Sequence, residues 1–305
     1  MSDEDHEPHS AAFFGRWRDF WWNVDHLELI ASRRALGDVR SVLDVGAGVG
    51  HWGTLLASVL SPDASIVGID REPQWIQEAT RRAERLGLGH RCQYQHGAAE
   101  SLPFDDATFD LVTCQTLLMH VADPSAVIRE MLRVTRPGGQ VIAAEPNNRA
   151  WFLVASSVTA GAEIEDTVDL MRFYLTCERG KIALGEGNLS IGDLLPSHFM
   201  DEGLSDVEAF VSDKAAVMLP PYASEEQQAR KQHFRETAQR GIWGLSRDQV
   251  RRFYTAGGGA ETEFDASWQR RAAEMHAVAN ALDTGDFRTA GGNIIYLVAG
   301  TRPSE

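Results

Sequence analysis

The sequence predicts an α/β fold built on a doubly wound, mostly parallel sheet of seven strands. Short runs rich in β-branched residues are followed by turn residues and then by helical patterns, and this unit recurs about every 25 residues between residues 41 and 147. Such repetition is typical of βαβ units, whose right-handed crossovers place helices on both faces of a parallel sheet. Two later candidate strands, Val207–Val211 and Asn293–Ala299, complete the seven.

The elements of the first half can be assigned in order. Strands are expected at residues 41–45, 65–69, 92–95, 109–114 and 140–145, and helices at 51–60, 73–86 and 124–134. Before them, Phe13–Leu36 carries aromatic residues at three- and four-residue spacing, which predicts a helix with one buried face. The string Arg136-Pro137-Gly138-Gly139 predicts a turn before the fifth strand.

Composition and charge disfavour several classes of protein. The 305 residues include 29 Lys and Arg against 44 Asp and Glu, a formal charge of −15. An acidic surface repels phosphate, so neither nucleic acid nor a membrane is expected as partner. Cys92, Cys114 and Cys177 are too few and too scattered for a disulfide framework or a zinc cluster, and no metal site is expected. With no apolar run of about 18–20 residues and no signal peptide, a cytoplasmic protein is predicted.

The strongest chemical signal is a glycine-rich string at the end of the first strand, Leu43-Asp44-Val45-Gly46-Ala47-Gly48-Val49-Gly50. Glycines there let the backbone approach a ligand because no Cβ intervenes. A dinucleotide site requires G-x-G-x-x-G, but His51 stands where the third glycine would be. Asp44 would also repel a pyrophosphate at the helix N-terminus. A carboxylate in that place suits a cationic ligand or one rich in hydroxyl and amine donors.

This string resembles the first motif of class I S-adenosylmethionine-dependent methyltransferases. Later landmarks follow in the order of that family: GIDREP (68–73), GAAESLPF (97–104), FDLVTCQTLLMHV (109–121) and LRVTRPGGQVIAAEPN (132–147). Together they cover about a third of the chain. The resemblance implies a Rossmann-like methyltransferase fold, S-adenosyl-L-methionine as cofactor with S-adenosyl-L-homocysteine as product, and in-line transfer of a methyl group.

The resemblance also implies which residues bind the cofactor. Asp70, 20 residues after Gly50, would accept hydrogen bonds from the ribose hydroxyls, and Asp44 would face the methionine portion. The family often has an acid where this chain has Ala98, so adenine is expected to bind through the backbone near Ala99 or through Glu100. The implied set is Asp44, Gly46, Ala47, Gly48, Gly50, Asp70, Arg71, Ala98, Ala99, Glu100 and Gln115.

His120 and Glu145 are the candidate general bases. Histidine titrates near the working pH, and Glu145 closes the fifth strand at the edge where open α/β sheets hold ligands. Either residue could instead be structural. The candidate substrate residues are Trp17, Trp21 and Trp22: their spacing favours core packing, while their aromatic faces could also form a lid that holds a cationic group.

The expected organisation is a core interrupted by helical insertions. Its segments are a flexible tail (1–12), an N-terminal helical cap segment (13–40), the cofactor-binding core (41–150), a helical insertion (151–190), a core continuation (191–212), a helical insertion or substrate cap (213–292), and the last core strand with a tail (293–305). The predicted function is methyl transfer to a small-molecule acceptor. A nicotinamide-dependent oxidoreductase, a methyltransferase acting on protein and a non-catalytic cofactor-binding protein are the alternatives.

Overall fold

The computed structural model describes residues 15–292 and 294–304, so the predicted tail at residues 1–12 lies outside the described part of the chain. The described residues divide into two compact units. We call them the sheet unit (residues 22–147, 187–213 and 294–304) and the helical unit (residues 15–21, 148–186 and 214–292). The candidate cofactor residues all belong to the sheet unit.

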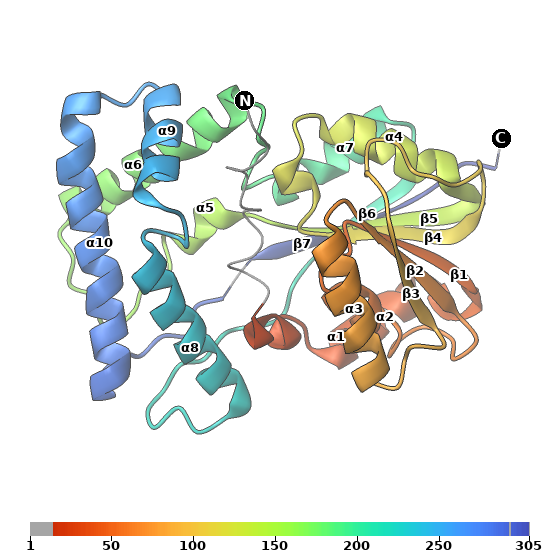
Figure 1. Cartoon of the computed structure of the whole chain (residues 1–305), viewed down its shortest axis with the longest axis horizontal. Coiled ribbons are helices and arrows are strands. Elements are labelled where there is room, and N and C mark those ends of the chain that lie inside the picture. The colour runs from red at the N-terminus through yellow and green to blue at the C-terminus, as the bar shows by residue number, and fades with distance from the viewer. Residues whose placement is uncertain (1–14, 293, 305) are drawn as a thin grey trace. The chain divides into compact units, whose positions relative to one another are not determined.

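A seven-stranded sheet forms the centre of the sheet unit (Figure 1). Its strands are β1 (Ser41–Val45), β2 (Ser65–Asp70), β3 (Cys92–His96), β4 (Phe109–Gln115), β5 (Thr135–Pro146), β6 (Ser205–Val211) and β7 (Ile295–Thr301). They lie in the order β3-β2-β1-β4-β5-β7-β6. Only β7 runs antiparallel to its two neighbours. The predicted mostly parallel sheet of seven strands is therefore confirmed.

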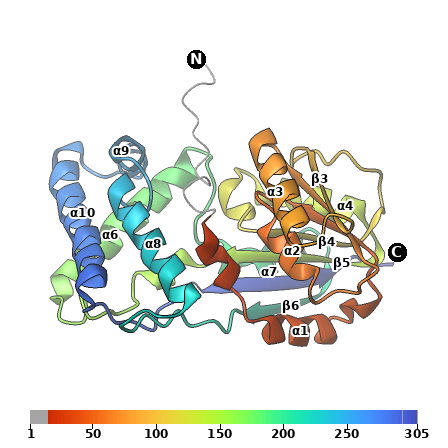
Figure 2. The same ribbon diagram turned by 60° about the horizontal axis from the view of Figure 1, so that its bottom comes forward.

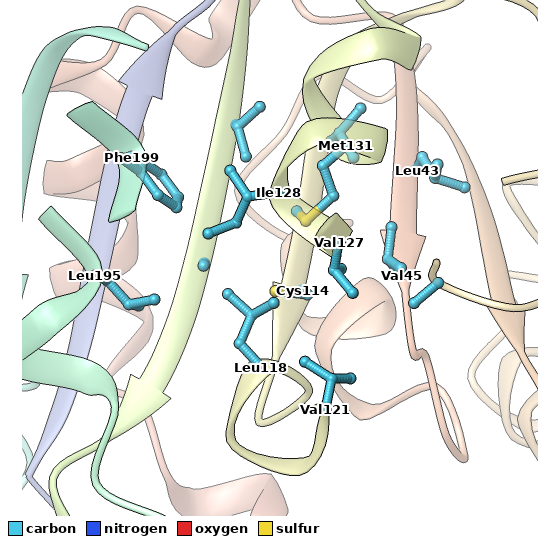
Figure 3. Packing of buried hydrophobic residues seen from close by; sticks show 14 of the residues in the cluster. Leu43, Val45, Cys114, Leu118, Val121, Val127, Ile128, Met131, Leu195 and Phe199 are labelled. Atoms are coloured by element: carbon cyan, nitrogen blue, oxygen red, sulfur yellow. The ribbon is translucent and has the colours of Figure 1, made fainter. Parts of the chain in front are cut away.

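Helices cover both faces of this sheet, as the doubly wound prediction requires. They are α1 (Val24–Arg33), α2 (His51–Leu56), α3 (Pro73–Arg85), α4 (Pro124–Val134) and α7 (Leu195–Asp201), with the short 3-10 helices η4 (Leu36–Asp38), η5 (Leu118–His120) and η6 (Gly192–Leu194). On one face, Ile128 and Met131 of α4 and Phe199 of α7 form a buried cluster with Val45 and Cys114 of the strands (Figure 3).

The opposite face is covered by α1 and α2. Leu27 of α1 and Trp52 of α2 approach Thr113 of β4 and Ile142 of β5. Because side chains alternate along a strand, Thr113 points away from the cluster that contains its neighbour Cys114. The indole N–H of Trp52 donates a hydrogen bond of 2.8 Å to the Thr113 hydroxyl, which fixes α2 on the sheet.

The N-terminal stretch differs from its prediction as one helix. A 3-10 helix, η3 (Arg16–Phe20), is separated from α1, and Asn23 between them has an extended backbone (φ −84°, ψ 131°). Trp17 and Trp21 are buried, as the aromatic spacing predicts, but Phe20 is only half-buried. The aromatic residues therefore do not form the buried face of a single helix. Trp17 packs in the helical unit against His233, whereas Trp22 packs in the sheet unit against Trp52.

The turn predicted at Arg136–Gly139 is part of β5 instead. The strand already begins at Thr135, which pairs with Phe109 of β4. The register then shifts, because Leu111 pairs with Gln140. The turn-forming residues are thus accommodated as an irregularity inside a continuous strand.

The helical unit includes residues 148–186 and 214–292, and that these segments are insertions into a core stays a prediction. Its helices are η3, α5 (Asn148–Trp151), α6 (Ile164–Ala183), α8 (Glu225–Arg240), α9 (Arg247–Ala256) and α10 (Glu261–Thr284). α6 lies against α9, and α8 lies against α10 (Figure 2). Phe173 of α6, Tyr254 of α9 and Phe264 of α10 form part of a buried core that is rich in aromatic residues. That this unit acts as a cap over the sheet stays a prediction.

Candidate functional site

The glycine loop after β1 has the conformation that its sequence indicates. Gly46, Gly48 and Gly50 have φ angles of +67°, +53° and +77°, in the left-handed region that other residues adopt only with strain. The loop is fastened to the next strand, since the Ala47 N–H donates to the Ile69 carbonyl at 2.8 Å. It therefore folds back over the carboxyl end of β2.

Asp70 is the main side-chain anchor of this loop. One carboxylate oxygen accepts the Gly48 N–H at 2.8 Å, and the other accepts the Glu72 N–H at 3.0 Å. The side chain is only half-buried. A carboxylate has about four lone-pair sites, so Asp70 retains capacity to accept hydroxyl donors from a ligand. Its predicted hydrogen bonds to ribose are compatible with this position.

Asp44 is buried beneath the loop, with 1% of its surface exposed. Its carboxylate accepts the N–H of Gly53, in the first turn of α2, at 3.0 Å. A negative charge at a helix N-terminus is favourable because it faces the unsatisfied amides there. Asp44 thus joins β1 to α2, and its predicted approach to the methionine portion of the cofactor stays a prediction.

Two buried polar groups beside the loop support its fit to a polar ligand. Within the described ranges, neither the Gln115 side-chain amide nitrogen nor the Tyr94 hydroxyl has a hydrogen-bond partner. Gln115 ends β4, and the Tyr94 hydroxyl lies 2.6 Å from where a Cβ on Gly50 would be. Burial raises the pKa of Tyr94, so its hydroxyl remains a neutral donor. Buried polar groups normally have partners, and a ligand rich in acceptors would supply them.

The expected adenine segment follows β3. Ala98 and Glu100 are exposed and Ala99 is buried. The tight turn is closed by the Ser101 N–H, which donates to the Ala98 carbonyl at 3.3 Å. Arg71 is exposed as well, and forms a weak ion pair of 3.7 Å with Glu72. These positions leave both predicted modes of adenine binding open.

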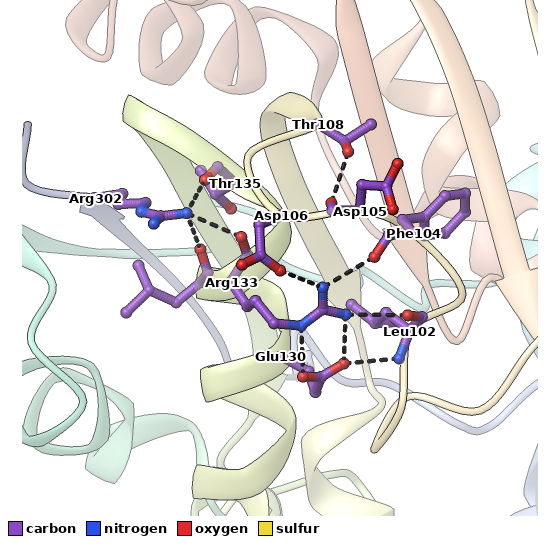
Figure 4. Close-up of polar contacts among 10 residues, drawn as sticks. Leu102, Phe104, Asp105, Asp106, Thr108, Glu130, Arg133, Thr135 and Arg302 are labelled. Atoms are coloured by element: carbon purple, nitrogen blue, oxygen red, sulfur yellow. Dashed lines mark hydrogen bonds and ion pairs between the residues drawn. The ribbon is translucent and has the colours of Figure 1, made fainter.

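Two residues of α4 that sequence reasoning missed hold the end of this segment (Figure 4). Glu130 accepts the Leu102 N–H at 2.8 Å, and Arg133 donates to the carbonyls of Leu102 and Phe104 at 3.0 and 2.9 Å. Glu130 and Arg133 also pair with each other at 2.8 Å. This pairing lowers the pKa of Glu130. Their three-residue spacing on a predicted helix was the available signal.

The turn after β4 contacts the glycine loop directly. Thr116 has a φ of +51°, which is unusual for a residue with a branched Cβ. Next to it, Leu117 packs so closely that a Cβ on Gly46 would lie 2.7 Å from the Leu117 Cδ1 atom. His120 ends η5 and is half-buried. The structure therefore places one candidate base on the turn that touches the loop.

Glu145, the other candidate base, has no exposed surface. One of its oxygens accepts the N–H groups of Leu117 and Leu118, each at 2.8 Å, and the other accepts the Met119 N–H at 3.2 Å. Glu145 and His120 thus lie at the same turn but in different environments. Whether either one removes a proton stays a prediction.

The three candidate substrate tryptophans are buried. Trp17 stacks on His233 with ring centroids 4.1 Å apart, and Trp21 meets Trp17 edge-on at 4.8 Å. Trp22 lies 5.6 Å from Trp52. These contacts are those of packed side chains. Their indole N–H groups nevertheless have no acceptor among the residues described, so a role in ligand binding remains a prediction.

The described part of the chain lacks both a membrane-spanning helix and a metal-binding cluster. It contains no helix with the length and apolarity needed to span a bilayer. It also contains no cluster of three or more His, Cys, Asp and Glu side chains arranged to bind a metal ion.

Comparison with known families decides the classification. The pattern of the methyltransferase domain family matches residues 37–235, which is 199 of the 305 residues. The chain belongs to this methyltransferase domain family. The match includes the glycine loop, Asp70 and the turn that carries His120.

Curated relatives of this methyltransferase domain match it over shorter stretches. A demethylmenaquinone methyltransferase of Listeria welshimeri is 31% identical over 133 residues, 43% of this chain and 54% of the relative. One of Bacillus cytotoxicus is 38% identical over 103 residues, 34% of this chain and 43% of the relative. An uncharacterised transposon protein of Streptomyces fradiae is 36% identical over 107 residues, 35% of this chain and 30% of the relative. The chain thus matches about half or less of each relative.

Solved structures share the fold over nearly the whole methyltransferase chain. A putative methyltransferase of Bacillus halodurans has a TM-score of 0.52 at 19% identity, covering 92% of this chain and 99% of the other. The YcgJ protein of Bacillus subtilis has a TM-score of 0.51 at 18% identity, covering 93% and 100%. At these identities the likeness concerns the fold alone, and it confirms the Rossmann-like methyltransferase architecture.

Proposed function

We propose that this chain is an enzyme that transfers a methyl group from S-adenosyl-L-methionine to a small molecule. The observation that carries the proposal is the glycine loop fastened by Asp70 at the carboxyl edge of the sheet. From β1 the chain adds β2 and β3 on one side of the sheet, and it then adds β4 and β5 on the other side. Open α/β sheets bind ligands at the point where the strand order reverses in this way. The loop, Asp70 and Gln115 all lie there.

The residues at this edge fit the cofactor by their chemistry. The backbone of the loop from Gly46 through Ala47 and Gly48 to Gly50 would lie against the cofactor, and the Asp70 carboxylate would accept the ribose hydroxyls. Ala98, Ala99 and Glu100 would lie by adenine, beside Arg71. When bound, the cofactor supplies a methyl group on a positively charged sulfur that is already a leaving group, so the protein has mainly to align the acceptor.

His120 is the proposed general base for an acceptor that must lose a proton. It is half-buried on the turn that touches the glycine loop, so it can be held near the reacting atoms while it remains able to exchange protons. Trp17, Trp21 and Trp22 are proposed to contribute to acceptor binding through their aromatic faces and indole N–H groups.

A small acceptor is supported by two observations. The relatives from Listeria and Bacillus are named as methyltransferases of demethylmenaquinone, a small molecule. The formal charge of −15 opposes binding to polyanions. We also propose a reducing, cytoplasmic setting, which agrees with the three cysteines being buried and free.

Replacement of Asp70 tests the cofactor proposal. Asp70→Ala should weaken binding of S-adenosyl-L-homocysteine by roughly 10- to 150-fold, because two charge-assisted hydrogen bonds to the ribose would be lost. Isothermal titration calorimetry measures the affinity, with Asp63→Ala as a control at an exposed acid. Equal affinity of the two variants would contradict the role of Asp70.

Two further measurements test the reaction itself. S-adenosyl-L-homocysteine at 100 times its dissociation constant should raise the melting temperature, because it would stabilise the folded protein by about 2.7 kcal/mol. NAD in its place should leave the melting temperature unchanged. Incubation of the enzyme with a cell extract and a methyl-labelled cofactor should label small molecules. Label found only in protein or nucleic acid would overturn the proposed acceptor class.

A further inference from the structure

The Glu145 side chain makes an unusual set of contacts for a fully buried carboxylate. It accepts at least three consecutive backbone N–H groups, those of Leu117, Leu118 and Met119, at 2.8, 2.8 and 3.2 Å. A carboxylate is well suited to this because both of its oxygens only accept hydrogen bonds. By comparison, Asp44 accepts at least one backbone N–H group and Asp70 accepts two.

These N–H groups belong to a turn that needs an external acceptor. They open the short helix η5, where the first amides have no partner within the helix. Thr116, just before them, has the strained φ of +51°. Strained residues persist where the surrounding structure holds them, and they concentrate at functional sites. Glu145 supplies that support from the neighbouring strand β5.

The turn is enclosed on both sides within the sheet unit. On one side the chain near Gly187 is so close that a Cβ there would lie 2.4 Å from the Met119 carbonyl oxygen. On the other side Leu117 presses on Gly46 of the glycine loop. A shift of the turn would therefore move Leu117 relative to the loop, and it would move His120 at the end of η5.

We propose that Glu145 is a positioning residue of the methyl-transfer site. Its carboxylate fixes the turn so that Leu117 sets the shape of the glycine loop and His120 keeps a defined direction. The proposal rests on the proposed function of that loop in binding the methyl donor. Glu145 itself transfers no proton, because its carboxylate is fully buried and already accepts three backbone N–H groups.

Glu145→Gln is the informative variant because it preserves shape and changes acceptor capacity. Glutamine keeps one acceptor oxygen, and its NH₂ group would face a backbone N–H, donor against donor. The amides of Leu117, Leu118 and Met119 should then exchange hydrogen about tenfold faster or more in the ligand-free protein. Amides of residues 111–115 in β4 should be unchanged, and Glu84→Gln, at an exposed position, should alter neither group.

Binding and kinetics separate positioning from proton transfer. Glu145→Gln should weaken S-adenosyl-L-homocysteine binding about tenfold and lower kcat, while the pH profile of kcat keeps its wild-type shape. Glu145→Asp, which retains both oxygens, should recover part of the affinity. Loss of one limb of the pH profile with unchanged affinity would show a general base and overturn the proposal.

A second variant keeps the test decisive if Glu145→Gln does not fold. Leu117→Ala removes the contact with the glycine loop and should weaken S-adenosyl-L-homocysteine binding, whereas Leu132→Ala, at another half-buried core residue, should not. Equal affinities would overturn the proposal. If the wild-type protein binds no S-adenosyl-L-homocysteine, the proposed function fails, yet the exchange rates of residues 117–119 still report whether Glu145 holds the turn.

Discussion

Three carboxylates at the ends of strands organise the candidate site. Asp44 of β1 accepts an amide of α2, Asp70 of β2 accepts an amide of the glycine loop, and Glu145 of β5 accepts amides of the turn after β4. Each one fastens a segment that would otherwise expose unpaired N–H groups. The three carboxylates therefore hold the backbone of the site in place. Asp70 alone of the three is half-exposed.

The effect of a side chain at Gly50 can be predicted at this scale. Gly50→Ala places a Cβ 2.6 Å from the buried Tyr94 hydroxyl and also imposes strain at φ +77°. Gly87→Ala has the same kind of backbone strain, at φ +70°, with nothing within 4 Å. The left-handed backbone costs roughly 1–2 kcal/mol in both variants. Overpacking should add about 1–3 kcal/mol for Gly50→Ala only.

Urea unfolding of the two variants checks this prediction. Gly50→Ala should also bind S-adenosyl-L-homocysteine more weakly than Gly87→Ala, since the loop must shift to avoid Tyr94. Equal stabilities and equal affinities would mean that Tyr94 moves aside without consequence.

At the scale of elements, the helical unit depends on a close approach of two helices. A Cβ on Gly180 of α6 would lie 1.7 Å from the Phe253 carbonyl oxygen of α9, and one on Gly257 would lie 1.9 Å from the Thr176 carbonyl oxygen of α6. Backbone atoms cannot rotate away as side chains can. Packing between α6 and α9 therefore explains why residues 180 and 257 are glycine.

Gly180→Ala should separate α6 from α9 and lower the free energy of unfolding by about 3 kcal/mol or more. Gly161→Ala is the matched control in the same unit, because nothing lies within 4 Å of its added Cβ. Thermal unfolding followed by circular dichroism compares them. A melting temperature of Gly180→Ala as high as that of the control would show that the two helices can move apart freely.

At the scale of the whole molecule, stability should depend on the charge of His233. Burial, with Arg230 and Arg240 nearby, lowers the pKa of His233 from 6.5 to about 4. The unfolded chain therefore takes up a proton at a higher pH than the folded protein does. The contribution of His233 to the free energy of unfolding is therefore complete above pH 6.5. It is lost as the pH falls toward 4, and the total loss is on the order of 3 kcal/mol.

Between neutral pH and pH 5.5, the free energy of unfolding should fall by about 1 kcal/mol less in His233→Gln than in the wild type. Denaturant unfolding at several pH values measures the difference in slope, which does not depend on the lost stacking with Trp17. Replacement of the exposed His90 by Gln is the control. Parallel pH dependences for wild type and His233→Gln would refute a neutral, half-buried His233.

Much of the sheet unit could be predicted from sequence because its signals are local. β-Branched runs, the glycine string and the stripes of apolar residues gave most strands and helices to within a few residues, and β1 and α4 were predicted with their observed ends. The glycine loop and Asp70 were found in the same way. Adjacent residues carry the conformational preferences and the periodic burial on which such predictions depend.

The remaining features depend on residues that only the folded chain brings together. Glu145 meets the turn 26 to 28 residues before it because β5 lies beside β4. Trp17 and Trp22 are close in sequence but are buried in different units. The sequence by itself determined the order of elements and the chemistry of the glycine loop, since short-range sterics and side-chain periodicity fix them. Tertiary structure alone decided which amides each carboxylate holds, because hydrogen-bond partners follow from the order of the strands in space.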